Sequence, residues 1–408
     1  MNSMESHLCF TPPQGARLHL GVCGSVAAFR ALDLLRHWRA CGVAVSATLT
    51  PAARRFVTPL SFEALGASPV YGDMFDANTG SFAHLEAGQI AQAMVIAPAT
   101  ASTLARLAHG FADEMLACQA LAHQGPLVLA PAMNPRMWSH PATQASAALL
   151  AERGAHIVVP ASGGVACGDE GQGRLADIRE IHLAGLKALY PQDMAGMRIM
   201  LTLGPTREQW DAVRFWSNPS SGVMGASLAV AAWLRGAEVD AVCGPGCPWL
   251  PSEIRRHEVV GARQMFEVAQ ALWPSIHCGI FAAAVADFSP EAHGPEKFKK
   301  TDAAGGFSIK FAPNPDILQT LAAQRHPGQK LVGFAAETAD DLSAAVRRKL
   351  LLKGADIVVG NRIGQEGTGF GTSTNAVHVA DATGREEQWP LMPKTEVAWR
   401  ICSWLLQM

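Results

Sequence analysis

Residues 17–50, RLHLGVCGSVAAFRALDLLRHWRACGVAVSATLT, indicate the fold class of the first half of the chain. The apolar run 18–22 predicts a β-strand, the amphipathic stretch 27–40 predicts a helix, and the run 43–49 predicts the next strand. Continuous apolar strands that alternate with helices are typical of a parallel sheet that is covered on both faces. The stretch therefore predicts an α/β fold.

The same alternation continues along the chain in two series. Further strands of the first series are expected at 93–97, 127–130 and 156–159, with a helix at 141–153. The second series has a helix at 220–235 and strands at 196–203, 238–242, 279–283, 331–335 and 357–360. Pro191 interrupts any helix across 188–195. We therefore predict two doubly wound, Rossmann-like parallel-sheet domains, of residues 1–190 and 191–408.

The composition agrees with two globular domains. Of 408 residues, 49% are apolar and 17% are charged, and the net charge of −2 gives no general attraction to nucleic acid or anionic membranes. No stretch reaches the roughly 18 apolar residues of a membrane span, and the N-terminus does not resemble a signal peptide. The nine cysteines show no zinc-type pairing, which predicts a reduced, cytoplasmic protein.

A loop of small residues, GVCGS at 21–25, joins the first predicted strand to a helix and lets backbone N–H groups approach a phosphate. The loop lacks the GxGxxG spacing, and no acidic residue follows the second strand. A mononucleotide is therefore favoured over a dinucleotide, and a nicotinamide oxidoreductase is disfavoured. The candidate phosphate ligands are Gly24, Ser25, Thr50, Thr100 and Ser102. The hydroxyl groups among them could equally cap helices.

Three further residues of the first half have side chains suited to catalysis. His84, in SFAHLE, could be catalytic or an ordinary surface or core histidine. Asn134, in PAMNPRMW, could bind a carboxylate through its amide or stabilise the turn before Pro135. Cys167 lies among five glycines in 163–174, whereas a structural cysteine prefers a packed apolar setting, so a reactive thiol is favoured.

Four motifs, SxxHL, PATAST, PAMNxxMW and ACGDxGxGR, occur in this order. Over residues 17–185 the chain resembles the flavin-containing cysteine decarboxylases, specifically 4'-phosphopantothenoylcysteine decarboxylase. The resemblance implies a flavodoxin-like domain with bound FMN, which oxidises the substrate thiol so that the neighbouring carboxylate can leave as CO2. It implies His84 as base or flavin partner, Asn134 as carboxylate ligand and Cys167 as proton donor. Met137 and Arg174 would contact the substrate.

The second half has its own ordered motifs, GPTRE, DxVRxxSNxSSGxMG, AAVADF, PEKxKK, NPDI and GFAAET. Over residues 196–405 it resembles phosphopantothenate–cysteine ligases. In these enzymes a nucleoside triphosphate, typically CTP in bacterial fusion proteins, activates the carboxylate of 4'-phosphopantothenate for attack by cysteine. The resemblance implies that Asn218 stabilises the acyl-cytidylate, that Lys297 assists the amine and that Arg207 contacts the substrate.

The same resemblance implies that Asp287 binds the nucleotide or its Mg2+ and that Phe334, Lys349 and Lys353 bind the nucleotide. Without the resemblance, the spacing of Lys349 and Lys353 already places both on one face of a predicted helix. That face could hold a triphosphate, or it could simply be solvated.

Some positions depart from the ligase pattern, and Val223 replaces its usual lysine. The other departures are Pro219, Pro313, Arg362 and Ser373. Fewer positive charges near anionic ligands leave a decarboxylase with an impaired ligase as one alternative. A flavin-binding regulatory subunit is another, disfavoured because His84, Asn134 and Cys167 are all present. The resemblance implies trimers for the flavin domain and dimers for the ligase domain, so a homo-oligomer is expected; a dodecamer would satisfy both symmetries.

Overall fold

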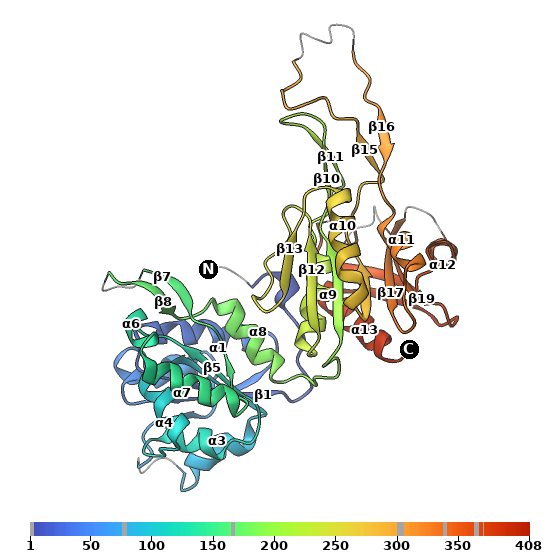
Figure 1. Ribbon diagram of the computed structural model, residues 1–408. Helices are drawn as coiled ribbons and strands as arrows, with labels where there is room; N and C mark the ends of the chain where they lie inside the picture. Colours follow the sequence, from blue (N-terminus) through green and yellow to red (C-terminus); the bar gives the residue numbers. More distant parts are fainter. Residues whose placement is uncertain are drawn as a thin grey trace. The chain divides into compact units, whose positions relative to one another are not determined.

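The computed structural model describes residues 4–75, 80–164, 168–299, 306–337, 341–362, 367–369 and 371–408. These residues form two compact units (Figure 1). Phe10–Pro191 builds the first unit, and Gln192–Met408 builds the second. The segment Glu5–Cys9 also belongs to the second unit, which the predicted division of the chain into 1–190 and 191–408 did not include.

The first unit is a six-stranded parallel sheet in the order β3-β2-β1-β4-β5-β6. Its strands are β1 (Arg17–Val22), β2 (Ala44–Leu49), β3 (Val70–Tyr71), β4 (Ala93–Ala99), β5 (Leu127–Pro131) and β6 (His156–Ile157). The strand order reverses between β1 and β4, and ligands bind such sheets beyond the carboxyl ends of the strands at that point. The loops that follow β1, β2, β4 and β5 therefore meet at one edge of the sheet.

Helices cover this sheet. They are α1 (Arg30–Ala40), α2 (Pro59–Ala64), α3 (Ala83–Ile90), α4 (Ala101–His109), α5 (Met115–Ala122), α6 (Pro135–Trp138), α7 (Pro141–Glu152) and α8 (Ile178–Lys187). Buried Trp38 of α1 donates its indole N–H to the His182 carbonyl of α8, 3.1 Å away. A Cβ at Gly185 would lie 2.7 Å from the Trp38 ring, so α1 and α8 can pack this closely only because that residue is glycine. A separate antiparallel hairpin, β7 (Ala161–Gly164) and β8 (Glu170–Arg174), precedes α8.

The second unit is an eight-stranded sheet in the order β13-β12-β9-β14-β17-β18-β19-β20. Its strands are β9 (Arg198–Leu203), β12 (Glu238–Cys243), β13 (Arg255–Glu258), β14 (Cys278–Phe281), β17 (Lys330–Glu337), β18 (Ile357–Arg362), β19 (Thr374–Asp381) and β20 (Glu386–Pro393). The strands are parallel from β13 to β18, as predicted. The last two are antiparallel, since the four residues between β19 and β20 are too few for a parallel crossover.

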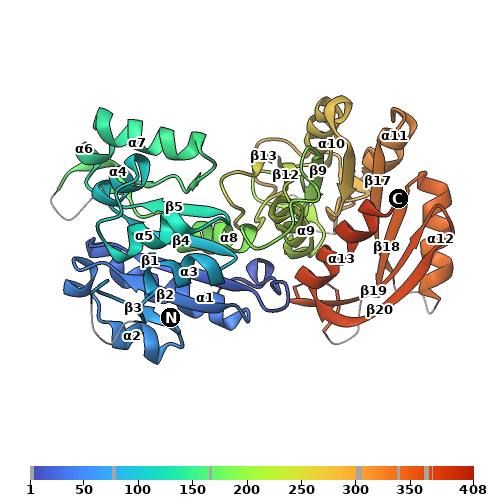
Figure 2. The same cartoon turned by 90° about the horizontal axis from the view of Figure 1, so that it is seen from below.

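The helices of the second unit are α9 (Val223–Leu234), α10 (Ala262–Leu272), α11 (Ile317–Ala323), α12 (Leu342–Lys353) and α13 (Lys394–Leu406). Figure 2 shows α9 beside α13, and α10 beside α11. Almost every residue of α9 is buried, partly because the short helix η1 (Ser6–Leu8) packs on it. Leu8 is fully buried, and the His7 ring bonds the Trp249 carbonyl at 2.7 Å.

An arm extends from the second sheet (Figure 1). We use this name for the hairpin β10 (Arg207–Gln209) with β11 (Phe215–Ser217), the pair β15 (Phe288–Pro290) with β16 (Phe311–Pro313), and the described residues between β15 and β16. The Trp210 ring stacks on Phe307 with 5.4 Å between the ring centroids and also contacts Phe298. These aromatic contacts hold the two parts of the arm together.

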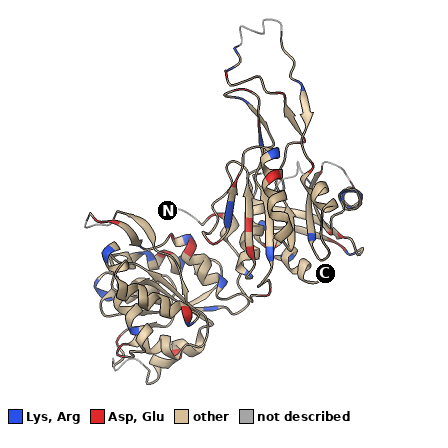
Figure 3. Ribbon diagram, in the orientation of Figure 1, with Lys and Arg blue, Asp and Glu red and all other residues tan. Residues whose placement is uncertain are grey.

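Acidic and basic side chains are interspersed over both units (Figure 3). Within the described part of the chain, no helix is both long and apolar enough to cross a membrane.

Candidate active sites

The loop after β1 lies against the loop after β2 at the carboxyl edge of the first sheet. A Cβ at Gly24 would lie 2.3 Å from the Ala52 Cβ and 2.9 Å from the Ala52 carbonyl carbon. Real Cβ atoms do not approach other atoms this closely, so the sequence requires glycine here for packing. The backbone of the β1 loop is thereby fixed beside Thr50, which follows β2.

The predicted hydroxyl groups line this edge, and each accepts a hydrogen bond. Ser25 accepts one from the Ala27 N–H at 3.3 Å, and Thr50 accepts one from the Ala53 N–H at 3.2 Å. Thr100 caps α4, and Ser102 accepts from Arg106 at 2.5 Å. The capping role considered for these hydroxyl groups therefore holds for Ser25 and Thr100, whereas Ser102 accepts from a side chain instead. A hydroxyl that accepts one bond still has its own O–H to donate, so capping does not prevent binding to a phosphate.

Asn134 lies at the same edge, directly after β5, and its amide is bonded on both sides. The oxygen Oδ1 accepts from the Arg136 N–H at 2.8 Å and so caps α6. The nitrogen Nδ2 donates to Oδ2 of Asp169 at 2.7 Å. Arg136 Nη2 donates to the other oxygen of the same carboxylate at 2.6 Å. Asn134 and Arg136 together therefore hold a carboxylate, here that of Asp169 from the loop between β7 and β8.

The other predicted residues of the first unit are placed as follows. His84 is half-buried in the first turn of α3, whose N-terminus lies at the carboxyl edge of the sheet. Met137 is 50% exposed on α6. Arg174 is exposed at the end of β8, with its guanidinium against Gly163. Cys167 lies outside the described residues.

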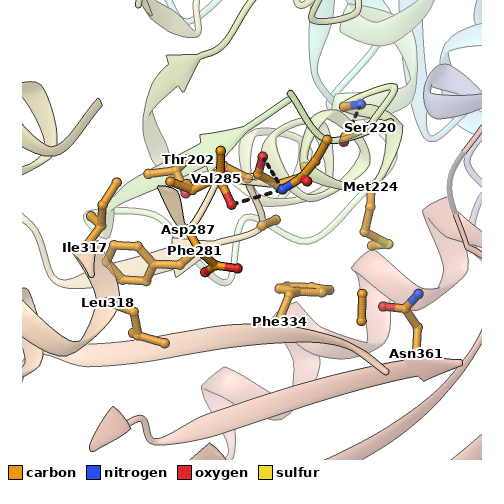
Figure 4. Close-up of a pocket in the computed structure, with 18 of the residues that line it drawn as sticks. Thr202, Ser220, Met224, Phe281, Val285, Asp287, Ile317, Leu318, Phe334 and Asn361 are labelled. Carbon is orange, nitrogen blue, oxygen red and sulfur yellow. Dashed lines mark hydrogen bonds between the residues drawn. The ribbon is translucent and has the colours of Figure 1, made fainter. Parts of the chain in front are cut away.

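The second unit has a cavity of about 450 Å³ beyond the carboxyl ends of β14 and β17 (Figure 4). Five predicted residues line it, namely Asn218, Asp287, Phe334, Lys349 and Lys353. Figure 4 shows Phe281, Ile317 and Leu318 together at one end of the cavity. Met224 and Asn361 lie at the other end, with Phe334 between the two groups.

The Asn218 amide nitrogen donates to the carbonyls of Ala284 and Val285, at 3.4 and 3.1 Å. It therefore fixes the loop that carries Asp287. The Asn218 oxygen is the part of the amide that remains to meet a ligand.

The two lysines of α12 differ in their surroundings. Lys353 is paired with Asp316. Burial lowers the pKa of Lys349, and Lys353 lowers it further, while Glu337 raises it. An anionic ligand would raise the pKa of Lys349 again because it would offset the cost of burying the charge.

Two predicted ligase residues are not among those that line the cavity. Lys297 and Arg207 are exposed on the arm, where Arg207 stacks over the Phe215 ring at 4.7 Å. Val223, the replacement for the usual lysine, does line the cavity. Sequence reasoning gave no role to several other lining residues, among them Asp316, Asn375 and Lys394. In the first unit it gave no role to Asp169. Only the place of Asp169 within the ACGDxGxGR motif could have identified it.

Comparisons with known proteins assign both halves of the chain. Residues 11–185 match the family model "Flavoprotein", and residues 194–408 match "DNA/pantothenate metabolism flavoprotein C-terminal domain". The coenzyme A biosynthesis bifunctional protein CoaBC of Vibrio vulnificus is 37% identical over 388 residues, which are 95% of this chain and 96% of that protein. CoaBC of Escherichia coli is 38% identical over 368 residues, 90% of each chain.

A crystal structure of the C-terminal domain of CoaBC is 33% identical and covers 53% of this chain and 97% of that one, with a TM-score of 0.45. The family predicted from the sequence motifs is confirmed by the two full-length relatives and by both family models. The chain therefore belongs to the family of bifunctional coenzyme A biosynthesis enzymes, which join a flavoprotein region to a DNA/pantothenate metabolism flavoprotein C-terminal region.

Proposed function

We propose that the second unit joins cysteine to 4'-phosphopantothenate with CTP, and that the first unit then decarboxylates the product with FMN to 4'-phosphopantetheine. In the first step the substrate carboxylate attacks the α-phosphorus of CTP and pyrophosphate leaves. The cysteine amine then displaces CMP from the acyl-cytidylate. The observation that supports the ligase half is the joint placement of Asn218, Asp287, Phe334, Lys349 and Lys353 around one cavity.

In this cavity Lys349 and Lys353 would bind the triphosphate, and the ring of Phe334 would pack against the nucleotide. A Mg2+ ion usually takes one or two carboxylates together with substrate phosphates. Asp287 fits this role because its side chain lines the cavity, as does Asp316. The described residues contain no cluster of three or more metal ligands, so the nucleotide would supply the remaining oxygens.

The decarboxylase half is supported by the bonds around Asn134. Its Nδ2 and the Arg136 guanidinium already hold a carboxylate, that of Asp169. We propose that the substrate carboxylate takes the same two donors during the reaction. Both donors lie on or next to the short helix α6 directly after β5, so the group that leaves as CO2 would be held at the carboxyl edge of the sheet.

The carboxyl edge of the first sheet also fits FMN. Gly24 keeps the β1 loop close to Ala52, and Ser25, Thr50, Thr100 and Ser102 surround it with O–H groups that can donate to a phosphate. When bound, FMN would take up two electrons as the substrate thiol is oxidised and return them after CO2 is lost. His84 would act beside it as base or hydrogen-bond partner. Cys167 would supply a proton to the product.

Other roles stay predictions from the resemblance. They are substrate contacts for Met137, Arg174 and Arg207, and assistance to the cysteine amine for Lys297. A homo-oligomer and a cytoplasmic location are proposed on the same basis.

A mass-resolved assay of the purified full-length chain tests both halves. With 4'-phosphopantothenate, cysteine, CTP and Mg2+ we expect pyrophosphate and 4'-phosphopantetheine, and with EDTA we expect neither. If only unreacted phosphopantothenate is found, the ligase proposal is contradicted and the impaired-ligase alternative is favoured. Chemically prepared 4'-phosphopantothenoylcysteine then tests the first unit separately, and a colourless protein that never decarboxylates it would contradict the FMN proposal.

Substitution of Gly24 by alanine should reduce FMN binding by about tenfold or more, since relief of the clash with Ala52 must move the β1 loop. The ratio of bound flavin to protein, measured from absorbance spectra, checks this. Gly80→Ala is the matched control because a Cβ there meets no atom of the described residues within 4 Å. Equal flavin content in both variants would show that the β1 loop does not hold the cofactor.

A further inference from the structure

Lys394, the first residue of α13, is a buried lysine that lines the cavity of the second unit. It is 5% exposed, and its Nζ donates to the Gly369 carbonyl at 3.1 Å. Among the described residues, no carboxylate pairs with it. Burial alone lowers the pKa of Lys394 to about 8, because no nearby negative charge offsets the loss of water. Buried charges in proteins are normally paired, so an anionic ligand group would stabilise this ammonium group.

Asn375 of β19 lines the same cavity as Lys394 and has an unbonded oxygen among the described residues. It is 3% exposed, and its Oδ1 has no hydrogen-bond partner among the described residues. The register of β19 and β20 pairs Asn375 with Met392, two residues before Lys394. A half-turn of the amide exchanges its oxygen and nitrogen, so the side chain can present either an acceptor or a donor to the cavity. An unsatisfied buried amide is costly unless a ligand satisfies it.

These two residues belong to the end of the cavity at which Asn361 lies, which we call its polar end. Asn361 lies at that end, away from Phe281, Ile317 and Leu318 (Figure 4). Asn361 pairs with Val377 of β19, so Asn375 lies two residues along from it on the neighbouring strand. Gly369, which accepts the bond from Lys394, lines the same cavity.

The charges that line the cavity also point to an anion. They are three lysines, Lys349, Lys353 and Lys394, and two aspartates, Asp287 and Asp316. Since Asp316 is paired with Lys353, its charge is already offset within the protein. Lys394 has no such partner among the described residues, and it is more deeply buried than Lys353.

We propose that Lys394 and Asn375 form a phosphate-binding subsite at the polar end of this cavity. The subsite would take a phosphate oxyanion of a ligand of the ligase reaction, and it rests on the proposed function of the second unit. Two ligands offer that chemistry, the nucleoside triphosphate and the phosphate ester of the acid substrate. Lys394 would donate a charge-assisted hydrogen bond, and the Asn375 amide would donate a second one.

Binding calorimetry on the full-length chain separates the two sources. We compare wild type, Lys394→Met and Lys394→Arg for four probes, namely CTP, cytidine, 4'-phosphopantothenate and pantothenate. Loss of a hydrogen bond to a charged group should weaken one phosphorylated probe by about tenfold to 100-fold. Its dephosphorylated counterpart should change less than about twofold, and Lys394→Arg should keep more of the affinity than Lys394→Met, because arginine also donates charge-assisted hydrogen bonds to phosphate. The pair that shows the difference identifies the phosphate that is bound.

Lys330→Met is the matched control, because Lys330 begins β17 and so lies at the opposite edge of the sheet from the cavity. A purely structural Lys394 is distinguished by thermal unfolding. Removing a buried charge that has no carboxylate partner among the described residues should leave the melting temperature of the second unit unchanged or higher, whereas loss of a structural contact should lower it. If Lys394→Met binds all four probes as wild type does, or loses all four together with a lowered melting temperature, the proposal is wrong.

The binding measurements test the subsite independently of whether the chain catalyses the ligase reaction. If the wild type binds CTP or phosphopantothenate but releases no pyrophosphate, the proposed ligase function fails while the subsite is still tested by binding. If Asn375→Leu weakens the same phosphorylated probe as Lys394→Met, the two residues act at one ligand group. An effect on a different probe would contradict a shared subsite.

Discussion

Exchange of Asn134 for aspartate is expected to slow decarboxylation about 100-fold to 1,000-fold while the first unit stays folded. Aspartate keeps an oxygen that can accept from the Arg136 N–H, and it caps helices as well as asparagine does. The donor Nδ2 is lost, however, and a second negative oxygen replaces it beside the carboxylate of Asp169 or of the substrate. Two carboxylates at that distance repel each other.

The rate of CO2 release from 4'-phosphopantothenoylcysteine measures this effect, with the flavin spectrum as a check on folding. The rate should recover partly at low pH, because protonation gives the new carboxyl group a hydrogen to donate. Asp177→Asn is the matched control, since it makes the reverse exchange between carboxylate and amide at another N-cap, that of α8. An Asn134→Asp enzyme as fast as wild type would mean that the amide does not hold the substrate.

Asn218→Asp should have an effect of similar size on the other activity, a loss of about 100-fold or more in acyl-cytidylate formation. Its amide nitrogen donates to the Ala284 and Val285 carbonyls, and a carboxylate oxygen in that position would face two acceptors. The loop that carries Asp287 should then move away from Asn218. Nucleotide binding and the chemical step would both suffer.

Pyrophosphate release with CTP and phosphopantothenate measures this loss. The decarboxylase rate of the same preparation serves as the internal control, since Asn218 belongs to the other unit. Asn218→Ala should be less damaging than Asn218→Asp, because alanine removes the bonds without adding repulsion. The opposite order would show that the Asn218 oxygen matters more than its contact with the loop.

The sequence was sufficient for the parts of this protein that follow from local pattern. Alternating apolar strands and helices predicted both parallel sheets, and the ordered motifs led to Asn134 and to five residues around the cavity. The antiparallel pair β19 and β20 was not predicted, because apolar runs alone do not reveal strand direction. Lys297 shows another limit, since motif order says nothing of whether a loop faces the cavity or extends on the arm.

Asp169 and Lys394 were missed for a different reason. Each is an ordinary polar residue in its local sequence, and its significance comes from distant partners. Asp169 meets Asn134 across 35 residues, and Lys394 meets Gly369 across 25. The burial of Lys394 and of Asn375, whose Oδ1 has no partner among the described residues, arises only once β19, β20 and α13 are assembled.

The segment Glu5–Cys9 makes the first unit an insertion within the second, between residues 9 and 192. During synthesis η1 leaves the ribosome before the first unit does, but the helices on which it packs, α9 and α13, are made only after that unit. The second unit can complete its core only when α13, which follows all of its strands in the sequence, is present. A chain that lacks α13 would therefore leave the apolar side of η1 exposed to quality-control proteases.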